Sequence, residues 1–253
     1  MRGAAAGSNR LRPLASNSGM RKLVVALAFL LATPAVADAG GESEPPVERT
    51  PVSSGAPCVV ELTDRVQAHY EGVRDLHAGF VQRQRSVVFG GSAEEQPAAR
   101  GEVWFAKPGR MRWSYREPEP SEVVTDGKTL WIYDPTAAEV QVLPVDEGFL
   151  SGAGFQFLLG EGRIRDSFQV TTEDCHLETA RLTLTPRAES TYELLHLWVA
   201  TGSGAVEQTE VADLFGNRTR VTFEGVETNQ DPSDEFFRFD PPEGVRVLEL
   251  TRP

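Results

Sequence analysis

The sequence predicts a mainly β protein (α+β), with about eleven strands in one antiparallel sheet and a small helical part. Short segments in which apolar and polar side chains alternate recur along the chain, and turn residues separate them. The regular succession of strand, helix and strand that a parallel sheet requires is absent. About 200 residues follow the N-terminal segment, which suits a single domain with a sizeable core. A sheet of this size is large enough to curl.

The N-terminal end of the chain has the parts of a secretory signal peptide. Residues 1–37 contain five basic residues and no acidic one, and residues 23–32 form a short apolar run. That run is too short for a membrane span, which takes about 20 residues. Small residues then predict cleavage after Ala37 or Ala39, and Met20 is an alternative start. Because no cysteine closely follows the apolar run, we expect an exported protein without a lipid anchor.

Residues 38–57 are rich in Gly, Glu, Pro and Ser and poor in large apolar residues. This composition predicts a disordered linker, so we expect the folded domain over residues 58–253. Loss of the five basic residues in 1–37 takes the net charge from −12 to −17. So acidic a chain is not expected to bind nucleic acid or anionic lipid headgroups directly.

Residues 59–73 predict an amphipathic helix, because apolar side chains recur there at helical spacing. These positions are Leu62, Val66, Tyr70 and Val73. Such a helix must cover an apolar surface. A strand is predicted next over residues 76–89, and a polar loop over residues 90–100.

Residues 101–134 give the clearest pattern, which predicts four short strands joined by tight turns. Residues 107–110 form the first turn, in which Pro108 supplies a fixed φ and Gly109 a permissive position. Residues 117–120 contain two prolines, which cannot donate to a ladder. Asp126-Gly127 indicates a hairpin, because that turn type needs φ > 0.

The second strand of this group has two chemically different faces. One face carries Met111, Trp113 and Tyr115. The other face carries Arg110, Arg112, Ser114 and Arg116. An apolar face opposite a cationic face is typical of an antiparallel sheet with one covered side.

A further strand is predicted over residues 139–143, and the pattern then changes in residues 145–163. Five glycines interrupt this apolar segment, and each interior glycine costs a helix about 1 kcal/mol. We interpret it as one or two short apolar helices on flexible joints, which suits a lid. The alternative is a connection packed permanently in the core. The large apolar residues are Phe149, Leu150, Phe155, Phe157, Leu158 and Leu159.

The remainder of the chain returns to alternating patterns. Five more strands are predicted, at residues 167–172, 179–186, 191–200, 205–214 and 217–226. In these segments Leu182 and Leu184 alternate with threonines, and Val221 and Phe223 alternate with polar residues.

The chain has two cysteines, Cys58 and Cys175. In an oxidising compartment such a pair can form a disulfide. The alternative is two separate buried thiols. Their spacing does not indicate a metal site, and no C-x-x-C motif is present.

No constellation of catalytic or metal-ligating residues is present in the sequence. The four histidines are scattered, and H-E-x-x-H and G-x-S-x-G motifs are missing. Gly127-Lys128-Thr129 resembles the end of a phosphate-binding loop but is better explained as a hairpin turn. We therefore expect no enzymatic activity, no cofactor and no metal.

Two motifs carry a resemblance to a known family. VWFAKPGRMRWSY, followed by DGKTLWIYDP, resembles the outer-membrane lipoprotein carrier proteins, the LolA family. The closing segment FRFDPPEGVRV is similar to the end of that family's domain. The resemblance covers roughly residues 58–247.

The resemblance implies an incomplete antiparallel β-barrel with an N-terminal helix and a short helical lid over an apolar cavity. It implies a monomeric periplasmic chaperone that takes acylated lipoproteins from an inner-membrane lipoprotein-releasing ABC transporter and delivers them to an outer-membrane lipoprotein acceptor. A buried CH₂ is worth about 0.8 kcal/mol, so acyl chains need such an escort through water. A periplasmic carrier of free lipid and a lipoprotein-sensing regulatory module remain alternatives.

The sequence pattern and the resemblance together give a candidate acyl-chain cavity. Its residues are Leu62, Val66, Phe80, Val103, Phe105, Met111, Trp113, Tyr115, Leu182, Leu184, Val221 and Phe223. Met111 replaces an aromatic residue of the family's barrel interior, and methionine is easily deformed. Lys107 stands where the family has an arginine that holds the lid closed. Lysine keeps the charge but loses the planar fork of donors, so the alternative to lid holding is a solvated turn lysine.

Overall fold

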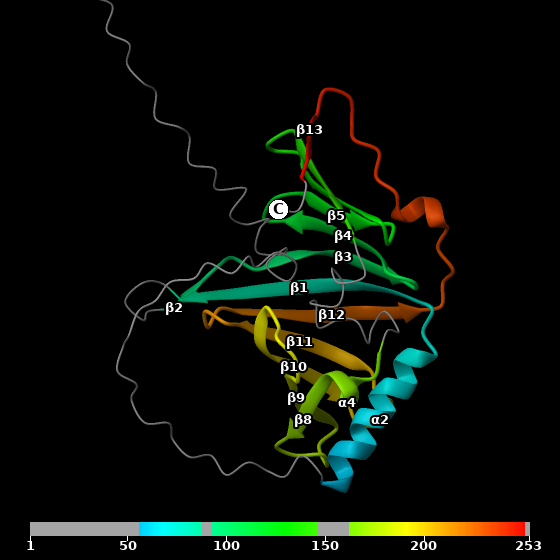
Figure 1. Ribbon diagram of the computed structural model, residues 1–253, viewed down its shortest axis with the longest axis vertical. Coiled ribbons are helices and arrows are strands. Elements are labelled where there is room, and N and C mark those ends of the chain that lie inside the picture. Colours follow the sequence, from blue (N-terminus) through cyan, green and yellow to red (C-terminus); the bar gives the residue numbers. More distant parts are fainter. Residues whose placement is uncertain (1–55, 88–92, 146–161, 251–253) are drawn as a thin grey trace, which may run out of the picture.

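The computed structural model describes residues 56–87, 93–145 and 162–250, and its strands form a single open sheet (Figure 1). The helical elements are α2 (Pro57–Glu71), α4 (Ile164–Ser167) and the 3₁₀ helix η1 (Asp234–Phe237). The strands of the N-terminal half are β1 (Asp75–Val87), β2 (Ala93–Glu95), β3 (Ala99–Ala106), β4 (Arg110–Glu117), β5 (Ser121–Thr125), β6 (Thr129–Asp134) and β7 (Glu139–Pro144). Those of the C-terminal half are β8 (Phe168–Thr172), β9 (Thr179–Pro186), β10 (Tyr192–Ala200), β11 (Val206–Asp213), β12 (Arg218–Thr228) and β13 (Arg246–Glu249).

The sheet has thirteen strands in the order β13-β7-β6-β5-β4-β3-β1-β12-β11-β10-β9-β8, and β2 pairs with β1. Pairing is antiparallel apart from β13, which lies parallel to β7. The mainly β fold class is confirmed, and the eleven predicted strands correspond to β1 and β3–β12. The two additional strands are β2 and β13. β2 corrects the prediction of a polar loop over residues 90–100, because its residues pair with the end of β1.

β1 joins the two halves of the sheet. Its thirteen residues pair with β3 on one side and with β12 on the other. Phe80 lies opposite Phe223 in this ladder, so apolar side chains from both halves meet on one face. We call the face that carries Phe80 the inner face and the opposite one the outer face.

The predicted hairpin turn at Asp126-Gly127 joins β5 to β6. Gly127 has φ = 90°, a conformation that favours glycine. The carboxylate of Asp126 accepts hydrogen bonds from the backbone N–H groups of Lys128 and Thr129, both at 2.8 Å. This Asx-type arrangement explains why Asp precedes Gly in this turn.

Helix α2 lies along the C-terminal half of the sheet, beside β8–β11 (Figure 1). Its backbone comes very close to the turn between β10 and β11. A Cβ atom added at Gly204, which has φ = 78°, would lie 2.6 Å from the carbonyl oxygen of Arg65. Arg65 in turn donates a hydrogen bond to the carbonyl of Thr201. A glycine at position 204 is therefore required both by the backbone conformation and by the helix above it.

The outer face is less exposed than the alternation in β4 predicts. η1 packs on β4, so that the guanidinium of Arg110 lies 5.3 Å from the ring centre of Phe237 and that of Arg112 lies 5.2 Å from the ring centre of Phe236. Arg112 also donates to the carbonyl of Phe236 at 2.8 Å. The prediction of one covered side and one open cationic side is thus wrong at this place. Cation–π contacts let the aromatic residues of η1 cover the arginines.

The segment interpreted as a lid lies largely outside the described residues, which resume at Gly162. Phe149, Leu150, Phe155, Phe157, Leu158 and Leu159 all fall in that part. At its C-terminal end the short helix α4 begins, an element that the sequence did not predict. Gln67 on α2 accepts a hydrogen bond from the backbone N–H of Ile164 at 3.0 Å, which fixes the start of α4 to α2.

Candidate functional site

The structure brings all twelve predicted cavity residues into one continuous apolar cluster, with ten of them on the inner face of the sheet and Leu62 and Val66 on α2, which covers part of that face. Nine of them are buried members of this cluster: Leu62, Val66, Phe80, Val103, Phe105, Trp113, Leu182, Leu184 and Val221. Met111, Tyr115 and Phe223 are partly buried and pack against it. Alternation along each strand places the ten strand residues on the same face, sheet pairing joins them, and α2 adds Leu62 and Val66 from above.

The part of the cluster on β1, β3 and β4 is aromatic. The ring of Phe80 lies 4.7 Å from the ring centre of Trp113, at an interplanar angle of 59°, and 5.1 Å from that of Tyr115, at 78°. Phe105 meets Trp113 edge to face at 6.0 Å. These tilted and edge-on arrangements are the ones that aromatic quadrupoles favour. Met111 lies next to this group on β4, opposite Phe105.

A polar pair lies within this aromatic region. The hydroxyl of Tyr115 donates a hydrogen bond to the side-chain carbonyl oxygen of Gln82 at 3.0 Å. Gln82 is buried, and burial raises the pKa of the Tyr115 phenol well above its usual range. Both side chains therefore stay neutral. The hydrogen bond pairs the Tyr115 hydroxyl with the Gln82 carbonyl oxygen inside an apolar surface. Gln82 is not among the predicted cavity residues, although its position two residues after Phe80 places it on the inner face.

The part of the cluster on β8–β10 is mostly aliphatic, with Phe168 and Tyr192 as its aromatic members, and lies under α2. Leu182 and Leu184 on β9 are fully buried, and so is Val66 on the facing side of α2. The helix is held in place at its C-terminal end, where the Tyr70 hydroxyl accepts a hydrogen bond from the backbone N–H of Val206 at 3.0 Å. Burial raises the pKa of Tyr70 to about 12, although this hydrogen bond opposes the rise. This half has the character of a fixed hydrophobic core.

Lys107 contacts α2 in the described part of the chain. Its ammonium group donates a hydrogen bond of 2.6 Å to the backbone carbonyl of Tyr70, in the last turn of the helix. A cation there also interacts favourably with the helix dipole. Partial burial lowers the pKa of Lys107, while the negative charge of Glu71 acts in the opposite direction. Lid holding by Lys107 stays a prediction, because residues 146–161 lie outside the described ranges.

Cys58 and Cys175 are joined by a disulfide, with their Cα atoms 6.0 Å apart. Cys58 lies in the first turn of α2, and Cys175 lies in the connection between β8 and β9. The bond therefore ties the N-terminal end of the helix to the aliphatic half of the sheet. Together with the Tyr70 contact it fixes α2 at both ends.

Two grooves border α2, and neither is lined by the predicted cavity residues. The larger, of about 520 Å³, runs between α2 and α4, and its lining is mostly polar: Thr63, Asp64, Gln67, Ala68, Glu71, Arg163, Ile164, Arg165 and Asp166. The smaller lies between the start of α2 and β8. The polar lining of the larger groove does not suit acyl chains.

The ranges that the structure describes contain no cluster of three or more His, Cys, Asp or Glu side chains arranged to hold a metal ion. No helix within them is long and apolar enough to cross a membrane.

The fold and the site define an open antiparallel half-barrel with a continuous apolar inner face. The model of the family "Outer membrane lipoprotein carrier protein LolA" matches residues 71–240, and the chain belongs to this family. The outer-membrane lipoprotein carrier protein of Alkalilimnicola ehrlichii is 33% identical over 183 residues, which cover 72% of this chain and 80% of the relative. That of Cupriavidus necator is 30% identical over 193 residues, covering 76% and 90%.

Among solved structures, a LolA superfamily protein from Nitrosomonas europaea aligns with 13% sequence identity and a TM-score of 0.40. The alignment covers 73% of this chain and 99% of that protein. The names of the two sequence relatives describe carriers and not enzymes.

Proposed function

We propose that this protein is a periplasmic chaperone that binds the acyl chains of lipoproteins released from the inner membrane and carries them to the outer membrane. Family membership and the names of the relatives support a carrier of lipoproteins. The observation that carries the proposal is the continuous apolar cluster on the inner face, which draws on both halves of an open sheet. Such concave apolar surfaces are the usual sites for apolar ligands.

The aromatic region is the part that we assign to cargo. Met111 and Tyr115 are only partly buried, unlike the leucines under α2. The flexible side chain of Met111 can adjust to chains of different shape. The broad faces of Trp113 and Phe80 offer a large apolar area at little cost in conformational entropy. Binding here leaves the α2-covered half unchanged.

The proposal includes export and two partners. The protein loses residues 1–37, receives cargo from a lipoprotein-releasing ABC transporter of the inner membrane and passes it to an acceptor at the outer membrane. Mass spectrometry of protein purified from the periplasmic fraction reads both the N-terminus and the cargo. Acyl-peptides in the preparation are expected. Phospholipid alone would indicate a carrier of free lipid, and an N-terminus at Met1 or Met20 would contradict export with cleavage.

Met111→Glu tests the cargo surface directly. A carboxylate at this position has no partner among the apolar side chains around it and would lie against the acyl chains, which is a costly desolvation. We expect loading of acylated lipoprotein to fall by about tenfold or more, with the fold retained because Met111 is partly exposed. Met111→Leu is the matched control and should load normally. Normal loading by Met111→Glu would place the cargo elsewhere.

A further inference from the structure

The turn between β11 and β12 presents two large apolar side chains to solvent. Leu214 is 63% exposed and Phe215 is 78% exposed. The turn itself is well ordered by hydrogen bonds. The carboxylate of Asp213 accepts from the backbone N–H groups of Phe215 and Asn217, at 2.8 and 2.9 Å. The side-chain oxygen of Asn217 accepts from the backbone N–H of Val87, at the end of β1, at 2.9 Å.

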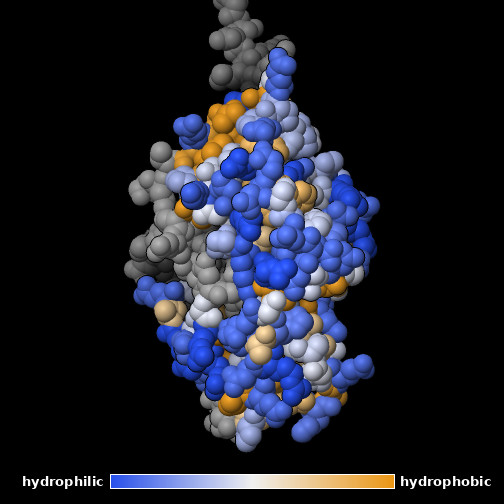
Figure 2. Space-filling view, turned by 90° about the vertical axis from the view of Figure 1, so that its right-hand side faces the viewer, coloured by the Kyte–Doolittle hydropathy of each residue, from blue (hydrophilic) through white to orange (hydrophobic). Residues whose placement is uncertain are grey.

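Single exposed apolar residues are common on protein surfaces. Here two of them lie at the tip of a hairpin that hydrogen bonds hold, next to a third exposed apolar residue, Val87. The tip is at the opposite end of β1 from the junction with α2 (Figure 1). The surface at the α2 and η1 end of the molecule is mostly hydrophilic (Figure 2). Exposed apolar side chains on a hydrogen-bonded turn indicate an interaction site when neighbouring residues favour the same kind of partner.

Arginines on the outer face next to this tip supply the second feature. Arg83 on β1 lies directly opposite Arg220 on β12, and Arg85 lies directly opposite Arg218. Like charges in directly opposed positions of a ladder destabilise a sheet. Arg83 and Arg85 are exposed, and within the described residues neither side chain makes a hydrogen bond or an ion pair. This arrangement costs stability, and an external anion would relieve it.

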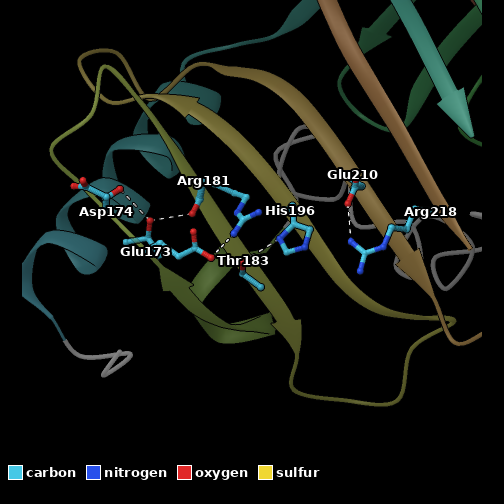
Figure 3. A network of polar contacts seen from close by, with 8 residues as sticks. Glu173, Asp174, Arg181, Thr183, His196, Glu210 and Arg218 are labelled. Atoms are coloured by element: carbon cyan, nitrogen blue, oxygen red, sulfur yellow. Dashed lines mark hydrogen bonds and ion pairs between the residues drawn. The ribbon is translucent and has the colours of Figure 1, made fainter. Parts of the chain in front are cut away.

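Two of the arginines are held in position by a buried carboxylate. Glu210 on β11 accepts hydrogen bonds from Arg218 at 2.9 Å and from Arg220 at 2.8 Å, and Figure 3 shows the contact with Arg218. Burial of Glu210 opposes its ionisation, but the two arginines prevail and lower its pKa. The guanidinium of Arg220 also lies 5.1 Å from the ring centre of Trp198. Both arginines nevertheless remain exposed, with donors that face solvent.

The local charge on this surface is positive although the whole chain is acidic. Glu210 and Glu95, which lies opposite Arg85 on β2, face the four arginines from the neighbouring strands, and Asp213 adds a third carboxylate in the turn itself. Four positive charges therefore stand against three negative ones. Neighbouring strands are about 4.8 Å apart, so the backbone positions of the four arginines lie within about one Debye length of one another. A flat layer of anionic groups would thus face a cationic surface. The net negative charge of the whole chain does not reveal this local positive charge.

We propose that Leu214 and Phe215, together with Arg83, Arg85, Arg218 and Arg220, form a docking surface for an anionic phospholipid membrane. The two apolar side chains enter the interfacial region, and the arginines contact headgroup phosphates, for which the guanidinium fork is well suited. A protein partner fits less well, because two projecting side chains offer far less than the area of a stable protein interface. A membrane requires only a small apolar insertion supported by basic residues.

Flotation of the purified exported protein, free of cargo, with lipid vesicles tests this proposal. We expect binding to vesicles of phosphatidylcholine mixed with phosphatidylglycerol and no binding to phosphatidylcholine alone. Leu214→Ser combined with Phe215→Ser should weaken binding by about tenfold or more. Arg83→Gln combined with Arg85→Gln should weaken it by about fivefold for each charge and reduce its dependence on salt.

Matched controls are available elsewhere on the surface. Leu177 is 57% exposed, and its carbonyl accepts a hydrogen bond from Thr201 in the β10–β11 turn, at the opposite end of β11 from the tip, so Leu177→Ser should bind as the wild type does. Met111→Glu should also bind vesicles normally, which separates this proposal from the proposed cargo site. Absence of binding to anionic vesicles, or equal loss in Leu177→Ser, would overturn the proposal. So would a wild-type dimer in sedimentation that the tip variant dissociates, because the tip would then be a protein interface.

Discussion

The two halves of the inner face use apolar side chains in different ways. The half on β8–β10 is mostly aliphatic, buried and covered by α2, which the disulfide and Tyr70 hold at both ends. The half on β1, β3 and β4 is aromatic, contains the Tyr115–Gln82 pair and includes the partly buried Met111. The first half has the properties of a core and the second those of a binding surface. One continuous cluster therefore combines a rigid part with an adjustable part.

Removal of the disulfide should have the largest effect on stability and should act on one half. Cys58 and Cys175 are 117 residues apart in sequence, and the chain-entropy model gives about 4–5 kcal/mol for a loop of this length. Cys58→Ser with Cys175→Ser should lower the free energy of unfolding by this order. Hydrogen exchange should rise in α2 and β8–β10 more than in β3–β5. Equal increases in both halves would contradict the distinction drawn between them.

Leu184→Ala and Met111→Ala compare the halves by the same kind of truncation. Leu184 is fully buried, so its truncation should cost about 2–5 kcal/mol of unfolding free energy through lost burial and a cavity. Met111 is partly buried, and its truncation should cost about 1 kcal/mol. Urea denaturation gives both values. We expect cargo affinity to change in the opposite order, with the larger loss in Met111→Ala. A larger stability loss in Met111→Ala would reverse the assignment of core and binding surface.

The smallest effect is expected at the contact between Lys107 and α2, where the β3–β4 turn of the aromatic half touches the helix. Lys107→Met removes the hydrogen bond to the Tyr70 carbonyl and should cost about 1 kcal/mol. Amide exchange in the last turn of α2 should increase. Lys107→Arg keeps a donor and a charge and is the control. If exchange changes within residues 145–163 and not in α2, lid holding is the better account of Lys107.

The strands were predictable where turn residues mark their ends and where apolar and polar side chains alternate along them. The hairpin at Asp126-Gly127 and the prolines at 108 and 118 punctuate β3–β6, and alternation in β4 assigns Met111, Trp113 and Tyr115 to the inner face. β13 was missed because its residues are mostly exposed and its pairing with β7 is parallel and distant in sequence. A short edge strand has no apolar face that would produce a period of two.

The candidate site was predictable as a set of residues but not as an arrangement. The pleat of the strands places ten of the twelve side chains on the inner face, and helical spacing places Leu62 and Val66 on one side of α2. Periodicity could not reveal that α2 covers only the leucine side, because this depends on the close approach of the helix to Gly204. The burial of Arg110 and Arg112 under η1 was equally hidden, since the aromatic residues involved lie more than a hundred positions later in the chain.

The position of β1 in the sheet also sets an order of assembly. If the chain crosses the membrane N-terminus first, as the proposed export requires, β1 can pair with β3 early through a short connection. Its other edge has to wait for β12, which is among the last strands to be delivered. Until then Phe80 lacks its neighbour Phe223, and the apolar side chains of the N-terminal half of the sheet stay exposed on that side. The inner face is thus completed only when nearly the whole chain has arrived, so the period of greatest exposure to aggregation is set by the rate of delivery.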